Sequence, residues 1–238
     1  MLNNKTMLEN FNKVLHRTSI STIYKHNNLV LKKTKNINGV SNKETNILRF
    51  LDHPNIPRVI FSQNTFNNQY LVMDYHPYGD LYDNYEKKNI DITDYNSFIS
   101  KLIRPIYYIH KNNVVHLDIK LENYLLTHNN EFMLIDFQVS DYHNNIYNHL
   151  DSLKYVVGSN HYVAPEVKEL AFCKSSDIYS LGCILHMIYA DRFYDGKIDY
   201  NLLKKCDNKL INIIENTLQE NHLHRPNIYD LTYFYNLK

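Results

Sequence analysis

The sequence contains little glycine and cysteine, and it lacks tryptophan altogether. Five glycines among 238 residues leave few positions for loops built on glycine. The three cysteines, Cys173, Cys183 and Cys206, include no Cys-x-x-Cys pair. Such an odd, sparse set argues against a disulfide framework and fits a reducing compartment.

Long hydrophobic runs and an excess of charge of one sign are also missing. Residues 1–11 are polar and contain no apolar core of signal-peptide length. The most apolar run, 181–190, is too short to span a bilayer. The net charge is +1, and the densest basic cluster is confined to positions 32–35. We therefore expect an intracellular, cytoplasmic protein with no membrane or nucleic-acid partner.

Asparagine, by contrast, is abundant, with 33 residues in the chain. Lys, Ile and Tyr are also over-used, whereas Ala and Arg are scarce. This is the composition of an A/T-rich coding sequence, such as that of a virus or a parasite, and it says nothing about function. For a viral protein the expected compartment is the host cytoplasm.

Two apolar runs, at 114–117 and 132–135, each lead into polar residues. The first is followed by Asp118, Lys120 and Asn123, and the second by Asp136. Carboxylate and amide oxygens suit Mg²⁺, and a lysine suits a phosphate. Buried strands that end in polar turns give the same pattern, so these residues alone leave both interpretations open.

The motif His-x-Asp-x-Lys-x-x-Asn at 116–123, followed by Asp-Phe at 136–137, resembles the catalytic loop and metal-binding segment of the protein kinase family. The family usually has arginine at the position of Leu117, proline at Leu121 and glycine at Gln138. The resemblance implies an enzyme that transfers a phosphoryl group from ATP with the help of Mg²⁺.

The resemblance also assigns roles to the polar residues. Asp118 would accept or orient the proton of the attacking hydroxyl, and Lys120 would stabilise the transferring phosphate. Asn123 and Asp136 would hold the metal ions that bridge the phosphates. A lysine two residues after the catalytic aspartate is typical of Ser/Thr kinases.

Motifs further along the chain extend the resemblance. Ala-Pro-Glu at 164–166 resembles the end of the activation loop, and Asp177 matches a residue that braces the catalytic loop. Arg225 matches the late arginine that pairs with Glu166. Kinase-like enzymes that act on small molecules generally lack these features, so the resemblance implies a protein substrate.

The absence of arginine at Leu117 bears on regulation. That arginine is the usual partner of a phosphate on the activation loop. We therefore expect activity that is not switched by phosphorylation of the three candidate hydroxyl residues, Ser152, Tyr155 and Ser159.

The first 75 residues are predicted to form strands and one helix. The β-prone runs are 11–16, 21–24, 28–33, 59–61 and 69–75. Lys32 matches the family's strand lysine, which contacts the ATP phosphates, although an exposed lysine at a strand end is the alternative. Glu44 matches the helix glutamate that pairs with it. Ser41-x-x-Glu44 is also a capping box, and between the two we favour the pairing with Lys32.

The glycine-rich loop of the family has no glycine here. His16, Thr18 and Ser21 stand at the glycine positions. Side chains there limit positive φ and hold the backbone further from phosphate. The hydroxyls of Thr18 and Ser21 offer hydrogen bonds in partial compensation.

The remaining nucleotide contacts also follow from the resemblance. Backbone groups of Asp74 and Tyr75 would hydrogen-bond the adenine, with Met73 behind it, although a plain core strand is an equally compatible interpretation. The apolar residues expected around the nucleotide are Leu15, Ile23, Val30 and Leu125.

The second part of the chain opens with the clearest helical pattern. Apolar residues recur at helical spacing over 94–111, with Thr93 or Asp94 as N-cap and a kink expected at Pro105. The segment between Ala190 and Leu210 is short for the family's helical subdomain.

Together these features predict an α+β, two-lobed protein-kinase-like fold. One domain would span 1–238, with an N-lobe of antiparallel sheet plus one helix over about 11–75 and a mainly helical C-lobe over 76–238. The expected function is Mg²⁺-dependent transfer of the ATP γ-phosphate to Ser/Thr hydroxyls of proteins. The alternative is a pseudokinase that acts as a binding module or decoy for a kinase's partner, favoured by the missing glycines and by Gln138. The sequence does not define the oligomeric state.

Overall fold

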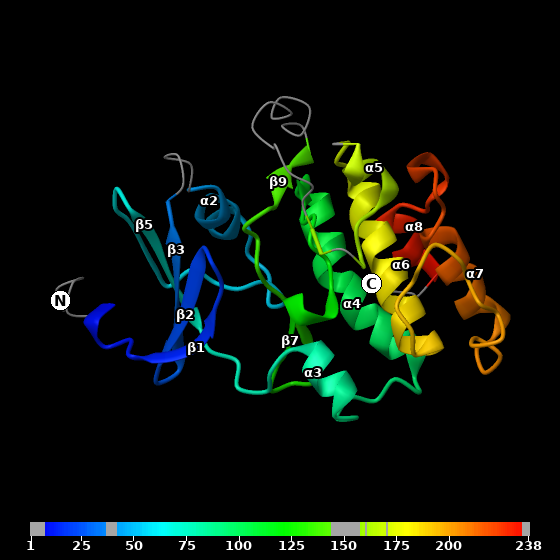
Figure 1. Cartoon of the computed structure of the whole chain (residues 1–238), viewed down its shortest axis with the longest axis horizontal. Coiled ribbons are helices and arrows are strands. Elements are labelled where there is room, and N and C mark those ends of the chain that lie inside the picture. The colour runs from blue at the N-terminus through cyan, green and yellow to red at the C-terminus, as the bar shows by residue number, and fades with distance from the viewer. Residues whose placement is uncertain (1–7, 37–41, 144–157, 160, 170, 235–238) are drawn as a thin grey trace.

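A computed structural model of the chain describes residues 8–36, 42–143, 158–159, 161–169 and 171–234. It is an α+β fold in which a sheet lies beside a larger helical part (Figure 1). The strands are β1 (Lys13–Arg17), β2 (Ser21–His26), β3 (Leu29–Lys35), β4 (Phe61–Asn64), β5 (Asn68–Asp74), β6 (Val114–Val115), β7 (Tyr124–Leu126), β8 (Phe132–Leu134) and β9 (Asp141–Tyr142). The α-helices are α2 (Lys43–Phe50), α3 (Leu81–Glu86), α4 (Tyr95–Lys111), α5 (Pro165–Lys168), α6 (Lys174–Ala190), α7 (Asn208–Thr217) and α8 (Ile228–Phe234).

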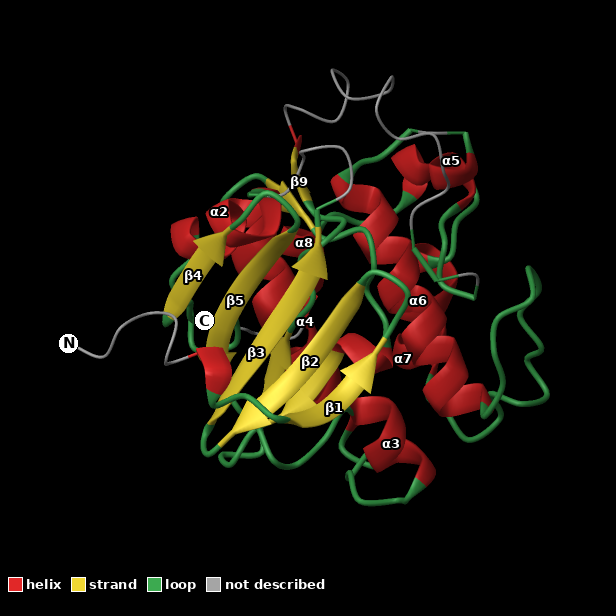
Figure 2. Ribbon diagram, turned by 60° about the vertical axis from the view of Figure 1, so that its left-hand side comes forward, coloured by secondary structure: helices red, strands yellow, loops and turns green. Residues whose placement is uncertain are grey.

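The first five strands form one antiparallel sheet in the order β1-β2-β3-β5-β4 (Figure 2). The turn between β2 and β3 places Asn27 at φ 51°, a left-handed conformation that asparagine tolerates. This turn sets the register that pairs Ser21 with Thr34 and His26 with Leu29. The predicted antiparallel sheet is therefore confirmed.

One predicted strand lies at the wrong place. The run 59–61 was expected to be extended, but β4 begins at Phe61 and continues to Asn64. The hairpin that follows determines this, because the Thr65 hydroxyl accepts the Asn68 N–H at 3.1 Å and closes the turn to β5. Pairing with β5 therefore places residues of low β propensity in a strand. Tertiary pairing thus outweighs the local sequence preference.

Helix α2 covers one face of the sheet (Figure 2). Ile47 and Leu48 are buried in the same core cluster as Leu71 of β5. The helix is only eight residues long, and Glu44 lies in its first turn. Burial of the Ile47 face therefore orients the start of the helix, and with it Glu44.

Helix α4 begins and ends where the pattern predicts. The Asp94 side chain caps it by accepting the Ser97 N–H at 3.1 Å, and the helix continues through Pro105. Phe98, Leu102 and Ile106 are at most 2% exposed and pack into the core.

Helix α6 is the central helix of this part, and its buried residues lie on all its sides. Gly182 is required here, since a Cβ at that position would lie 2.5 Å from the Thr217 hydroxyl of α7. Between α6 and α7, residues 191–207 form turns and no α-helix, in agreement with the expected short subdomain. Among the described residues, no helix has the length and apolar character needed to cross a membrane.

Candidate active site

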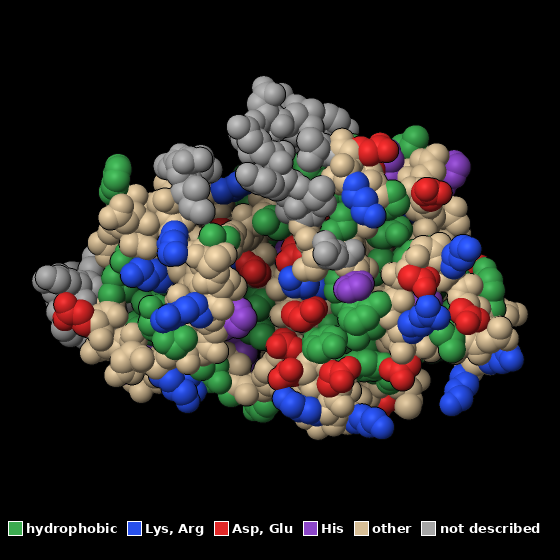
Figure 3. All heavy atoms as spheres, viewed as in Figure 1, with side chains coloured by type: hydrophobic (Ala, Val, Ile, Leu, Met, Phe, Trp, Pro, Cys, Tyr) green, Lys and Arg blue, Asp and Glu red, His purple; other side chains and the backbone are tan. Residues whose placement is uncertain are grey.

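A cavity of about 710 Å³ lies between the sheet and the helical part. Acidic, basic and histidine side chains gather in the middle of this face of the molecule (Figure 3). All the residues predicted to bind nucleotide line the cavity: Leu15, Ile23, Val30, Lys32, Glu44, Met73, Asp74, Tyr75 and Leu125. Lys120, Asn123 and Asp136 line it too. Segments far apart in sequence thus supply one site.

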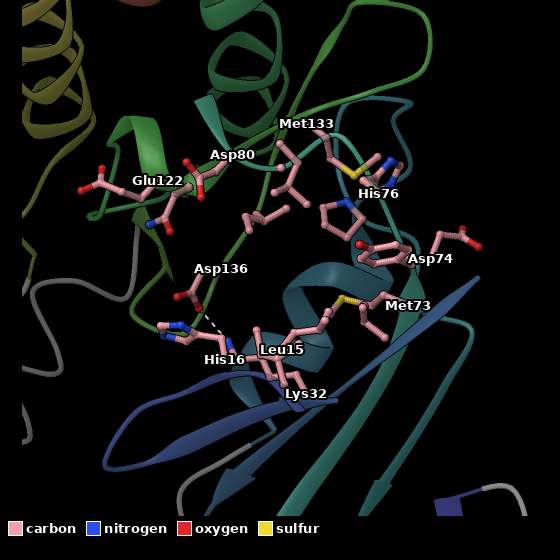
Figure 4. A pocket seen from close by; sticks show the side chains of 18 of the residues that line it. Leu15, His16, Lys32, Met73, Asp74, His76, Asp80, Glu122, Met133 and Asp136 are labelled. Atoms are coloured by element: carbon pink, nitrogen blue, oxygen red, sulfur yellow. Dashed lines mark hydrogen bonds and ion pairs between the residues drawn. The ribbon is translucent and has the colours of Figure 1, made fainter. Parts of the chain in front are cut away.

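Lys32 forms the centre of this site. Its Nζ lies 2.7 Å from Glu44 Oε1 and 2.6 Å from Asp136 Oδ1 (Figure 4). Lys32 and Glu44 are 5% and 6% exposed, so the interpretation of Lys32 as an exposed strand-end lysine is wrong. The N-cap of α2 is Asn42, which makes no side-chain cap bond, and Ser41 of the alternative capping box lies outside the described residues. The predicted pairing of Lys32 with Glu44 is confirmed.

The charges of this triad follow from burial and mutual attraction. Burial lowers the pKa of Lys32, but the carboxylates of Glu44 and Asp136 outweigh it and hold the pKa above its ordinary value. Burial also works against the ionised form of Asp136, yet Lys32 lowers the pKa of that carboxyl below its ordinary value. For Glu44 burial prevails and raises the pKa. Mutual attraction therefore favours the charged forms of Lys32 and Asp136, whereas burial opposes the charged form of Glu44.

Asp177 of α6 fixes the backbone of the catalytic loop through hydrogen bonds. Its carboxylate is 0% exposed and accepts the backbone N–H groups of His116 and Leu117 at 2.9 and 2.8 Å. His110 Nε2 lies 2.8 Å from the same carboxylate. Leu117 has φ 68°, a strained value for this residue type that Asp177 helps to maintain. The predicted bracing role of Asp177 is confirmed.

His116 links the catalytic loop to the segment that carries Asp136. It is fully buried and packs edge-to-face on Phe137, with ring centroids 4.8 Å apart. Burial lowers the pKa of His116, which keeps it neutral. Since a carbonyl only accepts, Nε2 donates to Ile135 at 3.0 Å, while Nδ1 accepts the Asp118 N–H at 3.3 Å. His116 is therefore a core residue behind the site.

Three side chains surround the Asp118 carboxylate. Lys120 Nζ lies 2.9 Å from Oδ2, and Asn123 Nδ2 donates to the same oxygen at 2.9 Å. Ser159 Oγ donates to Asp118 Oδ1 at 3.0 Å and accepts from Lys120 Nζ at 2.6 Å. From the sequence alone, Ser159 is only a candidate phosphorylation site. Of the other two candidates, Ser152 and Tyr155 lie outside the described residues.

Asn123 and Asp136 have the donor atoms that Mg²⁺ prefers. The Asn123 amide nitrogen is committed to Asp118, at its carbonyl (2.8 Å) and its carboxylate, which leaves the amide oxygen for a cation. The Asp136 side chain is 40% exposed and within reach of a ligand in the cavity. The described residues contain no cluster of three or more His, Cys, Asp or Glu side chains suited to a metal. The set therefore fits Mg²⁺ held jointly by the protein, water and phosphate oxygens.

The turn between β1 and β2 is closed by its own hydrogen bonds. Thr18 Oγ1 accepts the N–H groups of Ser21 and Ile20 at 3.0 and 3.3 Å, and it lies 3.1 Å from Ser21 Oγ. The Thr18 N–H donates to the Ser21 carbonyl at 2.8 Å. Both hydroxyls thus help to close the turn, yet Thr18 and Ser21 also line the cavity, and the expectation that they offer hydrogen bonds to a phosphate stays a prediction.

The segment after β5 also requires a correction. The Tyr75 N–H donates to the Asn28 carbonyl at 2.8 Å, because the β3–β5 pairing extends one residue beyond Asp74. That N–H is not free for adenine, although Tyr75 lines the cavity. The next residue, His76, also lines the cavity, and its N–H has no partner among the described residues.

The cavity wall also contains residues that were not predicted to bind nucleotide. The additional ones include His16, His76, Asp80, Glu122 and Met133 (Figure 4). Glu122 lies inside the catalytic motif and His76 directly follows the expected hinge, so position was an available signal for both. His16 stands at a glycine position of the loop expected to approach the phosphates, so its position was a signal too.

Two ion pairs support the site from outside the cavity. Arg225 donates to both oxygens of Glu166, at 2.7 and 2.8 Å, and its side chain is fully buried, which confirms the predicted pair. Burial disfavours the Glu166 carboxylate, but the bonds from Arg225 outweigh it and lower the Glu166 pKa. Lys43, at the start of α2, pairs with the buried Asp141 of β9.

Comparisons with known proteins agree with this geometry. The family model of the protein kinase domain matches residues 12–233. Calcium-dependent protein kinase 4 of Plasmodium berghei is 34% identical over 171 residues, which cover 69% of this chain and 32% of that protein. Hormonally up-regulated neu tumor-associated kinase of Mus musculus is 30% identical over 212 residues, 82% of this chain and 29% of that protein. The chain thus spans about a third of the length of these relatives. A family match over nearly the whole chain, together with the assembled site, shows that the chain belongs to the protein kinase domain family.

Proposed function

We propose that this chain is a protein serine/threonine kinase that uses ATP and Mg²⁺. The observation that carries the proposal is the bridge from Lys32 to Glu44 and Asp136, in the same cavity as Lys120 and Asn123. The proposal treats 1–238 as one domain, with lobes at about 11–75 and 76–238. A kinase needs ATP from its surroundings, and the cytoplasm is the compartment we propose.

Each charged group has a role in phosphoryl transfer. Lys32 neutralises phosphate oxygens, and Glu44 holds its ammonium in place. Asn123 and Asp136 would hold Mg²⁺, which supplies charge neutralisation on the phosphates. Asp118 accepts or orients the hydroxyl proton of the substrate, and Lys120 stabilises negative charge beside it.

The adenine would occupy the apolar end of the cavity. Leu15, Val30 and Leu125 supply apolar surface there, with Met73 at its inner wall. The free N–H of His76 is a better candidate donor to the base than that of Tyr75, which bonds to Asn28. This arrangement fits a mostly apolar site with a few polar groups that fix orientation.

The proposed substrate is a Ser or Thr hydroxyl of a protein. Lys120 contacts Asp118 from two residues along the chain, which supports the Ser/Thr assignment. Ser159 Oγ bridges Asp118 and Lys120, so a small hydroxyl fits between the two groups. The Glu166–Arg225 pair supports a protein substrate, because small-molecule kinases of related fold generally lack it.

Transfer of radiolabelled γ-phosphate from Mg-ATP tests the proposal. The wild type should label Ser and Thr, and not Tyr, in a mixture of protein substrates. Asp118→Asn should reduce the rate by roughly 10²–10⁴-fold, since it removes the proton acceptor while keeping the shape. Equal labelling by both proteins, or no labelling by either, would refute an active kinase.

A second function has specific observations in its favour. His16, Thr18 and Ser21 replace the loop glycines, and Gln138 replaces the glycine after Asp136–Phe137. A pseudokinase that binds a kinase's partner would keep the Glu166–Arg225 and Asp177 anchors while losing turnover. The two functions differ in whether Mg-ATP binds and reacts.

We also propose that phosphorylation of the activation segment does not switch the activity. Leu117 is buried in an apolar cluster with Val115, Ala164 and Phe172, so it offers no charge to a phosphate. Phosphatase treatment should therefore leave the transfer rate unchanged. A large loss of activity after treatment would contradict this.

A further inference from the structure

A β-bulge turns His16 toward the cavity. Val14 pairs with Tyr24 and His16 pairs with Ile23, so Leu15 has no partner of its own on β2. A bulge breaks the alternation of side chains along a strand and redirects them. Accordingly, the neighbouring residues Leu15 and His16 both line the cavity.

His16 lies at the end of the cavity that holds the charged residues. In Figure 4 its ring is on the side of Lys32 and Asp136, whereas Met73 and Asp74 are on the opposite side. His16 itself is exposed, and no hydrogen bond joins its ring to another described residue. The imidazole is therefore free to bind a ligand next to the Lys32 ammonium.

Most backbone donors of the adjacent turn are already engaged. The N–H groups of Thr18, Ile20 and Ser21 all bond within the turn, to Ser21 O or Thr18 Oγ1. A backbone cradle for phosphate needs N–H groups that point at the ligand. Here three of these N–H groups are engaged and only that of Ser19 has no partner among the described residues, while a side-chain N–H donor lies at the start of the same turn.

We propose that the His16 imidazole is a binding residue for the phosphates of a nucleoside polyphosphate, in place of the backbone N–H groups of the turn. This inference rests on the proposed function, because it requires a nucleotide in the cavity. An imidazole N–H donates to a phosphate oxygen, and a bond to a charged acceptor is stronger than a neutral one. His16 then contributes to binding of the phosphates and not of the nucleoside.

Calorimetric titration with Mg-ATP and with adenosine separates these two contributions. His16→Ala should weaken Mg-ATP binding about tenfold, the loss expected for one hydrogen bond to a charged group, and leave adenosine binding unchanged. His16→Gln, which keeps an N–H donor, should recover part of the affinity. His128→Ala removes an exposed histidine outside the cavity wall and should bind both ligands like the wild type.

Two results would overturn the inference while the proposed function stands. One is a wild-type affinity of His16→Ala for Mg-ATP. The other is an equal weakening of Mg-ATP and adenosine, which would mean that His16 supports the nucleoside end or the turn. Failure of the wild type to bind Mg-ATP would instead refute the proposed function, and this inference with it.

Discussion

The β1–β2 turn and the catalytic loop are built in opposite ways. The turn is closed by bonds among Thr18, Ile20 and Ser21, within four residues of sequence. The catalytic loop is held by Asp177, about 60 residues away, and through His116 by the carbonyl of Ile135. Changes in the turn should therefore stay local, whereas changes under the loop should affect the whole helical part.

The electrostatics sharpen the same contrast. The Asp177 carboxylate, which holds the catalytic loop, is fully buried, and so is the Arg225 side chain that pairs with Glu166 in the same helical part. Removing one partner of a buried pair leaves a charge without compensation, which is costly. The turn is exposed, and water can replace its lost hydrogen bonds at little cost. The following predictions test this contrast, from the largest expected effect to the smallest.

The largest effect is expected at Glu166. Glu166→Gln leaves the buried guanidinium of Arg225 without a counter-charge and should lower the free energy of unfolding by about 3–5 kcal/mol. Urea denaturation measures this. Glu169→Gln, an exposed change nearby, should have almost no effect. A loss below about 1 kcal/mol for Glu166→Gln would show that buried long-range pairs do not dominate.

The same pair predicts a pH dependence. Because the Glu166 pKa is lowered in the folded state, its stabilisation is complete above the ordinary glutamate pKa of about 4.3. It is lost as the pH falls through the lower, folded-state value. The difference in free energy of unfolding between wild type and Glu166→Gln should thus be constant above about pH 5 and shrink below it. A difference that does not change on acidification would contradict the assignment.

The next effect is expected at Lys32, which lines the cavity together with residues of the β1–β2 turn and of the catalytic loop. Lys32→Met should reduce kcat/KM for Mg-ATP by roughly 10²–10³-fold, since it removes a preorganised cation from the phosphate end. Lys33→Met is the matched control, because that lysine lies over the Tyr70 ring and does not line the cavity. Equal activities of the two variants would show that Lys32 has no role in the reaction.

A smaller effect is expected at the link between α2 and β9. Lys43 pairs with Asp141, and Asp141 is opposite Val115, just before the catalytic loop. A double-mutant cycle of Lys43→Met and Asp141→Asn should give a coupling of about 1 kcal/mol in the free energy of unfolding. Arg49→Met, in the exposed last turn of the same helix, should show no coupling to Asp141→Asn.

The smallest effect is expected in the turn itself. Thr18→Gly releases the N–H groups of Ile20 and Ser21, and we expect Mg-ATP binding tighter by about two- to fivefold. Stability should fall by less than about 1 kcal/mol. Ser19→Gly adds a glycine at a neighbouring exposed position without removing the Thr18 hydroxyl. Tighter binding by both variants would point to flexibility and not to the released N–H groups.

Much of the catalytic loop could be predicted from sequence, because its residues have fixed spacing within one short motif. Asp118, Lys120 and Asn123 lie within six residues, and the structure brings them together around one carboxylate. The Lys32–Glu44 pair was also predictable, although only the side-chain geometry shows that Glu44 bonds to Lys32.

The turn and the sheet edges were less predictable, because tertiary pairing decides them. The bulge at Leu15 depends on the register with β2, and the sequence places His16 in the loop without showing that its side chain lines the cavity. Similarly, the engagement of the Tyr75 N–H follows from the end of the β3–β5 ladder. The link from Lys43 to Asp141 joins residues 98 apart and has no motif of its own.

The central claim is that a catalytic centre with an intact charge set still holds Mg-ATP beneath a turn without glycine. The most direct test is the melting temperature of the wild type as the Mg-ATP concentration rises. At a hundredfold excess over Kd, binding should add about 2.7 kcal/mol to the free energy of unfolding and raise the melting temperature by roughly 5–10 °C. An unchanged melting temperature at millimolar Mg-ATP would contradict the claim and favour the binding module.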